Sequence, residues 1–149
     1  MCKKSRKINV DVVLLTLDLK KLNAGNGDIA VEIWLDAIKI FDQYLIAQER
    51  QIKHEYDDTS GKHELQIVLK DKTLTVDHED VELHPMVEVS NICLDGVKID
   101  NLMYQLATYN HSKDLRQNHK FFGRMGCEGT VSLQWLSPYY QWILEQTHP

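Results

Sequence analysis

Short runs in which apolar and polar residues alternate are the feature that most constrains the fold of this chain. The segments 29–35, 64–70 and 130–135 place a hydrophobic residue at every second position. A period of two puts successive side chains on opposite faces, which is typical of strands with one buried face. The run 64–70 belongs to a strand over 62–70, and further strands are expected at 8–19, 50–56, 73–76, 87–89 and 97–102. About eight strands at intervals of roughly 8–12 residues predict an all-β fold, an antiparallel β-sandwich or jelly roll.

The segments between these runs predict local connections. The polar stretch Asp57–Gly61 favours a tight turn, so 50–56 and 62–70 are expected to form one hairpin. The alternation breaks at Asn91–Leu94, which indicates a β-bulge before the Asp95–Gly96 turn. The segment 102–109 fits either a helical turn or an extended edge strand.

A short C-terminal helix is expected over 137–145. Ser137 is of the type that caps a helix N-terminus, and Pro138 suits the first helical position. No repeat or linker divides the chain, so residues 1–149 are expected to form a single β-sandwich domain.

Composition excludes several classes of protein. The 43% hydrophobic content supports a folded core, and no run approaches the roughly 20 uncharged apolar residues of a membrane span. The apolar stretch 10–19 contains Asp11 and Asp18, so we do not expect a signal peptide. A net charge of −5 argues against a general nucleic-acid binder. Three widely spaced cysteines, without a CxxC pair, fit a reducing compartment, and Cys93 and Cys127 are expected to be packed.

Two groups of residues suggest metal chemistry. His54 and His63 flank the 57–61 turn, although two histidines without a third ligand favour exposed strand residues over a zinc site. Between 71 and 100 there are eight acidic residues against two lysines. Oxygen-rich loops suit Ca²⁺, and the candidate ligands are Asp77, Glu79, Asp80 and Glu82. A solvated acidic loop is the alternative.

Partner binding is expected at two other places. The basic residues of the segment 111–124 are suited to an acidic neighbour, and they are Lys113, Arg116, Lys120 and Arg124. Aromatic side chains gather at the C-terminus, where Tyr139, Tyr140 and Trp142 are of the kind that anchor interfaces or stack on sugars. The alternatives are a solvated loop and a helix that plugs the end of the sandwich.

Four segments carry a family resemblance. They are 33–45 (IWLDAIKIFDQYL), 61–73 (GKHELQIVLKDKT), 87–111 and 121–145, the last with FFGRMGCEGT followed by SPYYQWILE. The chain resembles small jelly-roll proteins of tailed phages that infect marine cyanobacteria, which are similar in fold to calcium-dependent xylan-binding modules. The resemblance implies a virion-associated structural or adhesive protein, assembled in the host cytoplasm. It transfers no functional residue to this sequence.

Three hypotheses of function follow. The first is a non-enzymatic virion protein (tail, neck, fibre or capsid decoration) that assembles with copies of itself or with other virion proteins. The alternative is a calcium-assisted carbohydrate-binding module for host-surface glycans, with stacking by Trp34, Tyr44, Trp135 or Tyr139. A glycan hydrolase with two carboxylates is the third and is disfavoured, because acidic residues on strands usually form a solvent face. No catalytic residues are assigned, since none of the common phosphate-binding, esterase or zinc-protease motifs occurs.

Overall fold

The computed structural model describes residues 12–23, 27–45, 49–59, 61–72, 84–112 and 119–147. The strands are β1 (Val12–Leu22), β2 (Ala30–Leu35), β3 (Ile38–Tyr44), β4 (Glu49–Asp57), β5 (Lys62–Lys70), β6 (Met86–Leu94), β7 (Val97–Lys98), β8 (Thr108–His111), β9 (His119–Lys120), β10 (Arg124–Met125) and β11 (Gly129–Leu136). The helices are α2 (Asp100–Leu106) and α3 (Tyr139–Thr147). The described part of the chain is therefore mostly strand.

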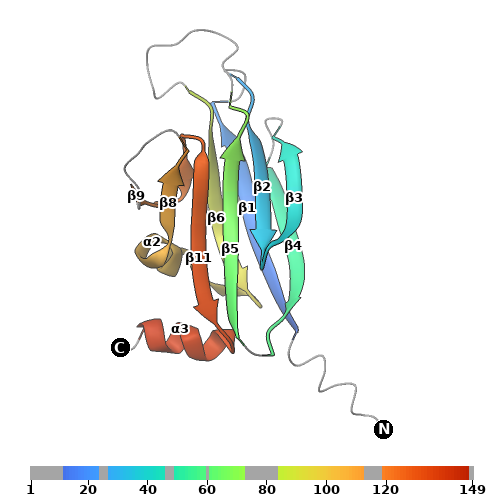
Figure 1. Ribbon diagram of the computed structural model, residues 1–149, viewed down its shortest axis with the longest axis vertical. Coiled ribbons are helices and arrows are strands. Elements are labelled where there is room, and N and C mark those ends of the chain that lie inside the picture. Colours follow the sequence, from blue (N-terminus) through green and yellow to red (C-terminus); the bar gives the residue numbers. More distant parts are fainter. Residues whose placement is uncertain are drawn as a thin grey trace.

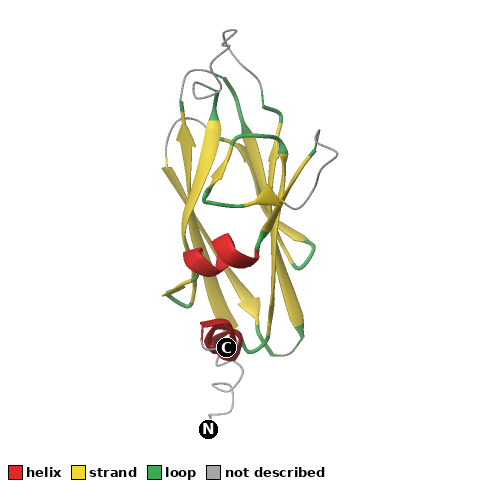
Figure 2. Cartoon of the chain, turned by 90° about the vertical axis from the view of Figure 1, so that its left-hand side faces the viewer, coloured by secondary structure: helices red, strands yellow, loops and turns green. Residues whose placement is uncertain are grey.

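The strands form two antiparallel sheets packed face to face (Figures 1 and 2). Sheet A has the order β10-β6-β1-β4, with β7 paired to β6, and sheet B has the order β3-β2-β5-β11-β8-β9. All the pairings are antiparallel. The predicted antiparallel β-sandwich with a short C-terminal helix is confirmed.

The alternating residues build the core between the sheets. Along β1, Leu15, Leu17 and Leu19 are fully buried and the intervening side chains are half-buried. The odd-numbered residues of β5 and β11 do the same from the opposite sheet, and Trp135 is among the largest buried side chains. Each such aliphatic residue contributes about 1.5–3 kcal/mol through burial, so the period of two selects the sandwich.

The prediction that 50–56 and 62–70 form one hairpin is wrong. Strand β4 pairs with β1 in sheet A, whereas β5 lies between β2 and β11 in sheet B. The chain thus crosses from one sheet to the other after Asp57. Strands β4 and β5 bury alternate residues in the same core, β4 from sheet A and β5 from sheet B. If β4 and β5 were paired in one sheet, the other sheet would lose a strand that covers this core. His54 and His63 consequently do not face each other, and His63 is buried.

Three local features refine the predictions. The bulge is confirmed, because the β1–β6 register shifts opposite Asn91, whose φ is 51°. The segment 102–109 contains both alternatives, with α2 ending at Leu106 and β8 starting at Thr108. Strand β3 was not predicted, and it follows β2 through the two-residue turn Asp36–Ala37.

The two helices close the sandwich at different places. Figure 2 shows α2 on the near side of the two sheets and α3 below them. Helix α2 buries Leu102 and Met103 in the core, and α3 buries Trp142. The cysteine prediction is wrong for Cys127, which is exposed, while Cys93 is half-buried. In the described part of the chain, neither helix has the length and apolar character needed to cross a membrane.

The start of α3 differs from the prediction. The first helical residue is Tyr139, and the carbonyl oxygen of Pro138 accepts from Trp142 N, so Pro138 occupies the N-cap position. The capping carboxylate comes from Asp58, 81 residues earlier, whose Oδ2 lies 2.9 Å from Tyr139 N. The Ser137 hydroxyl contacts Asp58 instead of the helix backbone. A distant acidic residue thus performs the role expected of Ser137.

Candidate functional site

The outward-facing side of sheet B presents a largely polar surface built from regular strands. Its side chains alternate with the buried ones along four strands and are mostly half-buried. We call this surface the sheet B face, and it comprises Glu32, Trp34, Glu64, Gln66, Val68, Lys70, Thr108, Asn110, Thr130, Ser132 and Gln134. Figure 1 looks onto this face, and no labelled helix or strand lies across it.

One row of side chains crosses the whole of sheet B. Strand register aligns Lys39 with Trp34, Trp34 with Gln66, Gln66 with Ser132, Ser132 with Thr108, and Thr108 with Lys120. Adjacent strands lie about 4.8 Å apart, so the six positions span about 24 Å. An aromatic ring, an amide and two hydroxyls thus follow one another across the sheet.

The charged groups around Trp34 are paired with one another. The indole Nε1 donates to Glu32 Oε1 at 2.8 Å, and Lys70 Nζ donates to the other carboxylate oxygen of Glu32. Lys70 also lies 3.1 Å from Asp42 Oδ1, while Lys39 Nζ lies 2.9 Å from Asp42 Oδ2. The Lys39 ammonium is 5.5 Å from the centroid of the Trp34 ring, within cation–π range. Two lysines and two carboxylates therefore balance one another here.

These contacts set the protonation of the cluster. The hydrogen bond from Lys70, and then that from Trp34, holds the pKa of Glu32 below its ordinary value of 4.5. Hydrogen bonds from Lys39 and then Lys70 lower the pKa of Asp42, and the same carboxylates raise the pKa of Lys70 above its usual range, Glu32 contributing most. Glu32, Asp42 and Lys70 are thus charged at neutral pH, and Glu32 fixes the orientation of the indole.

The arrangement has the chemistry of a polyol-binding surface. A sugar ring has apolar C–H faces and a rim of hydroxyls, so it matches an aromatic face bordered by amides, hydroxyls and carboxylates. Gln66 lies beside Trp34 in the row and Ser132 follows on the next strand, while Gln134 donates to Glu64 at 3.3 Å in the next row. The neutral amides supply both donors and acceptors to a ligand.

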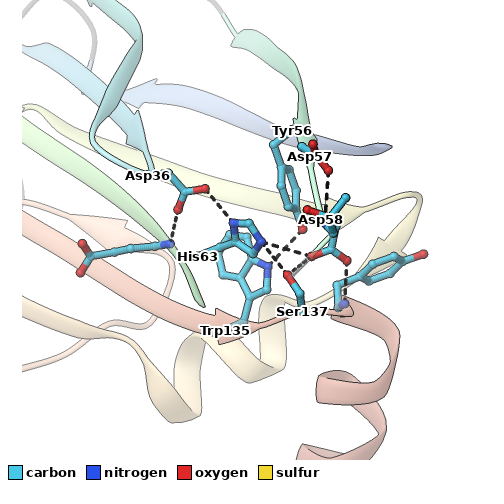
Figure 3. Close-up of polar contacts among 10 residues, drawn as sticks. Asp36, Tyr56, Asp57, Asp58, His63, Trp135 and Ser137 are labelled. Atoms are coloured by element: carbon cyan, nitrogen blue, oxygen red, sulfur yellow. Dashed lines mark hydrogen bonds and ion pairs between the residues drawn. The ribbon is translucent and has the colours of Figure 1, made fainter. Parts of the chain in front are cut away.

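A second polar cluster lies at the end of the sandwich where α3 begins (Figure 3). His63 Nδ1 is 2.7 Å from Asp36 Oδ2, and His63 Nε2 is 2.7 Å from Ser137 Oγ. Ser137 Oγ donates to Asp58 Oδ1 at 2.6 Å. Trp135 Nε1 donates to the Tyr56 hydroxyl at 3.1 Å, and burial raises the pKa of this phenol above its usual range.

The order of contacts from Asp36 through His63 to Ser137 is that of a catalytic triad, but the surroundings do not suit a hydrolase. An activated serine needs a free hydroxyl and backbone donors aimed at the developing oxyanion. Here the Ser137 hydroxyl donates to Asp58, Tyr139 N is bound by the same carboxylate, and Ser137 N donates to Gly61 O at 2.9 Å. We therefore interpret the cluster as a structural junction between sheet and helix.

The residues proposed for calcium lie outside the described part of the chain. This applies to Asp77, Glu79, Asp80 and Glu82, so the calcium site stays a prediction. Among the residues that are described, no group of three His, Cys, Asp or Glu side chains is arranged to hold a metal ion.

The residues proposed for partner binding are distributed over several elements. Lys113 and Arg116 lie outside the described ranges, whereas Lys120 on β9 and Arg124 on β10 are exposed, the latter 3.5 Å from Glu88. Their role in partner binding stays a prediction.

The aromatic residues of the C-terminal segment divide into two groups. Trp142 is buried and Tyr139 is half-buried against the core, whereas Tyr140 is 60% exposed. Among the residues expected to stack on sugars, Trp135 is 1% exposed and inaccessible, so that expectation is wrong for it. Trp34 and Tyr44 remain available, on β2 and β3.

Sequence reasoning missed two parts of the site. Gln66, Ser132 and Thr108 carry no motif, and only the strand register places them in one row with Trp34. The partners of His63 lie 27 and 74 residues away, so no local spacing reveals them. The alternation of 64–70 and 130–135 was the one sequence signal that could have indicated the outward-facing residues of the site, because it separates them from the core residues.

Comparison with known proteins gives a likeness in fold only. No family model and no curated protein matches the chain. One similar solved structure is vCBM60 in complex with galactobiose, with a TM-score of 0.48 and 10% identity over 80% of this chain and 95% of that one. Another is the SeMet form of vCBM60, from work on two families of calcium-dependent carbohydrate binding modules, with a TM-score of 0.46, 10% identity and coverage of 80% and 88%. Neither comparison bears on the resemblance to phage proteins, which stays a prediction.

Proposed function

We propose that this protein is a non-enzymatic carbohydrate-binding module whose sheet B face binds a neutral, linear oligosaccharide. The observation that carries the proposal is the row through Trp34, Gln66 and Ser132, on a face across which no helix or strand of the described residues lies. The likeness to vCBM60 concerns the fold and adds no weight to the choice of ligand.

The charge pairing supports a neutral ligand. Lys39 and Lys70 are bound by Asp42 and Glu32, so neither ammonium is left to recognise a uronate or a sulfate. A sugar that stacks on the Trp34 ring replaces the Lys39 ammonium over that ring, and the face of the indole becomes the apolar floor of the site. Calcium assistance by the acidic residues between 71 and 83 is a separate part of the proposal.

Binding to a panel of neutral and acidic oligosaccharides tests the proposal, with galactobiose, cellotetraose, xylotetraose and an oligogalacturonate as probes. We expect a neutral member to bind, and Trp34→Ala to raise its Kd about tenfold or more, as for the loss of a central aromatic anchor. Lys39→Ala should leave the Kd unchanged or lower it. Tyr140→Ala is the matched control, because this exposed aromatic lies away from the face, on α3.

Three results bear on the parts of the proposal. Equal binding by wild type and Trp34→Ala would contradict the location of the site. Loss of affinity in Lys39→Ala together with a preference for the oligogalacturonate would contradict a neutral ligand. Chelation of divalent cations tests calcium separately, since an unchanged Kd would remove the ion from the proposal and leave the sheet B face.

Assembly with other proteins is a second candidate, favoured by exposed apolar residues at the end of the sandwich where α3 lies. Leu136, Tyr140 and Leu144 are each more than half exposed at the end of β11 and on α3. Such residues are typical of an interface with a second copy or a virion protein. Sedimentation of wild type and of Tyr140→Lys/Leu144→Lys tests this candidate. A wild-type monomer that also binds no other virion protein would contradict it.

A further inference from the structure

The turn between β2 and β3 is strained and stands next to the glycan-binding row. Its two residues, Asp36 and Ala37, have φ of 53° and 67°, a left-handed conformation that favours Gly and Asn. Trp34 and Lys39, the first two members of the row, lie just outside this turn and are paired with each other. Because β3 is the outer strand of sheet B, β2 and the turn are what hold it.

The side chain of Asp36 holds the turn. Its Oδ1 accepts from Glu64 N at 2.8 Å, while its own backbone N donates to Glu64 O at 2.9 Å. Its Oδ2 accepts from His63 Nδ1 at 2.7 Å. The residue in the strained conformation is therefore fixed to β5 from both its backbone and its carboxylate.

His63 is itself held in place. It is 6% exposed, and its ring lies 4.9 Å from that of Tyr56 and 6.0 Å from that of Trp135. Its second nitrogen contacts Ser137 Oγ and lies 3.3 Å from Asp58 Oδ1 (Figure 3). A packed ring with both nitrogens engaged presents Nδ1 to Asp36 in one orientation.

We propose that His63 is a positioning residue for the sheet B face, acting through Asp36 and the strained turn on Trp34. The role as a positioning residue for a ligand rests on the proposed function, whereas the hold on the turn does not. Removal of the Nδ1 donor allows Asp36 and Ala37 to relax toward ordinary backbone angles. Lys39 and Trp34 then lose their alignment with Gln66.

The test compares His63→Phe in two turn backgrounds, the native turn and D36N/A37G. An Asn-Gly pair adopts this turn unaided, so it makes the conformation independent of His63. In the free protein, NMR follows the HN–Hα coupling at position 37 and the indole N–H resonance of Trp34. We expect His63→Phe to shift the Trp34 resonance in the native turn and to leave it in place in D36N/A37G.

Ser137→Ala is the matched control, because it removes the helix-side partner of His63 and keeps the Asp36 contact. We expect it to leave the Trp34 resonance unchanged. If His63→Phe does not fold, Asp36→Ala replaces it, since the Asp36 side chain is 35% exposed and its removal leaves the core intact. Unchanged resonances in the native turn, or an equal shift in Ser137→Ala, would overturn the proposal.

Affinity gives the second measurement, with whichever of galactobiose, cellotetraose or xylotetraose the wild type binds most tightly. We expect His63→Phe to raise the Kd about threefold or more in the native turn and to have no effect in D36N/A37G. The effects of the two changes are then not additive, as is usual for residues that contact each other. An equal rise in both backgrounds would indicate a merely structural role and refute positioning. A wild type that binds none of the three contradicts the proposed function and the role toward a ligand, while the resonances still decide whether His63 holds the turn.

Discussion

Asp58 is predicted to be the most important single contact between α3 and the sandwich. Asp58 is 6% exposed, and its carboxylate accepts from Ser137 Oγ at 2.6 Å and from Tyr139 N at 2.9 Å. Hydrogen bonds to a charged group contribute about 1.5–3 kcal/mol each, and buried donors that lose their acceptor retain a desolvation cost. Asp58→Ala should therefore lower the free energy of unfolding by about 3–5 kcal/mol, and Asp58→Asn by about half as much.

Equilibrium urea unfolding followed by tryptophan fluorescence measures this loss, and near-UV circular dichroism reports the packing of Trp142. Asp57→Ala is the matched control, because this neighbouring carboxylate is exposed and accepts a longer bond, 3.2 Å, from Thr59 N. Its loss should cost less than about 1 kcal/mol. Equal losses in Asp58→Ala and Asp57→Ala would refute the assignment of Asp58 as the acceptor that fixes the helix.

Two further predictions concern sheet B. A Cβ at Gly129 would lie 2.3 Å from Asn110 O, so Gly129→Ala should force β11 and β8 apart and lower the free energy of unfolding in urea by about 1–3 kcal/mol. Gly126→Ala is the control and should cost little, because a Cβ there meets nothing nearer than 3.9 Å. Equal losses in the two variants would contradict this packing. The pKa of Glu32 is lowered in the folded state, chiefly by Lys70, so its stabilising contribution is present above pH 4.5 and is lost as pH falls through the lower folded-state pKa. Unfolding midpoints measured from pH 7 downward should thus fall less steeply in Glu32→Gln than in wild type, and parallel curves would show that the ion pair contributes nothing.

The sequence was sufficient for the fold class but not for the strand pairing. Burial every second residue in 29–35, 64–70 and 130–135 follows from the periodicity alone, and the structure has it. The predicted pairing of β4 with β5 was wrong because the turn residues at 57–61 are equally compatible with a crossing between sheets. Strand β3 was missed because the turn Asp36–Ala37 lacks the glycine that usually marks such a hairpin.

The candidate site was predictable only in part. Trp34 was named among the residues that stack on sugars because it lies on the polar side of an alternating strand. Its neighbours Gln66 and Ser132 carry no motif, since amides and hydroxyls on strands are ordinary surface residues until the register aligns them. Trp135 was named as well, although it shares the apolar side of the 130–135 run with Val131 and Leu133, and that side is the buried one.

Mapping of a bound oligosaccharide by NMR tests the central claim most directly. The wild-type protein is titrated with galactobiose, cellotetraose and xylotetraose, and amide and indole N–H shifts are followed with and without a chelator. A ligand on the sheet B face should shift the Trp34 indole and the side-chain amides of Gln66 and Gln134, and leave the indole N–H of Trp142 unchanged. Shifts confined to α3 or to the segment 73–83, or none with any of the three sugars, would contradict the account.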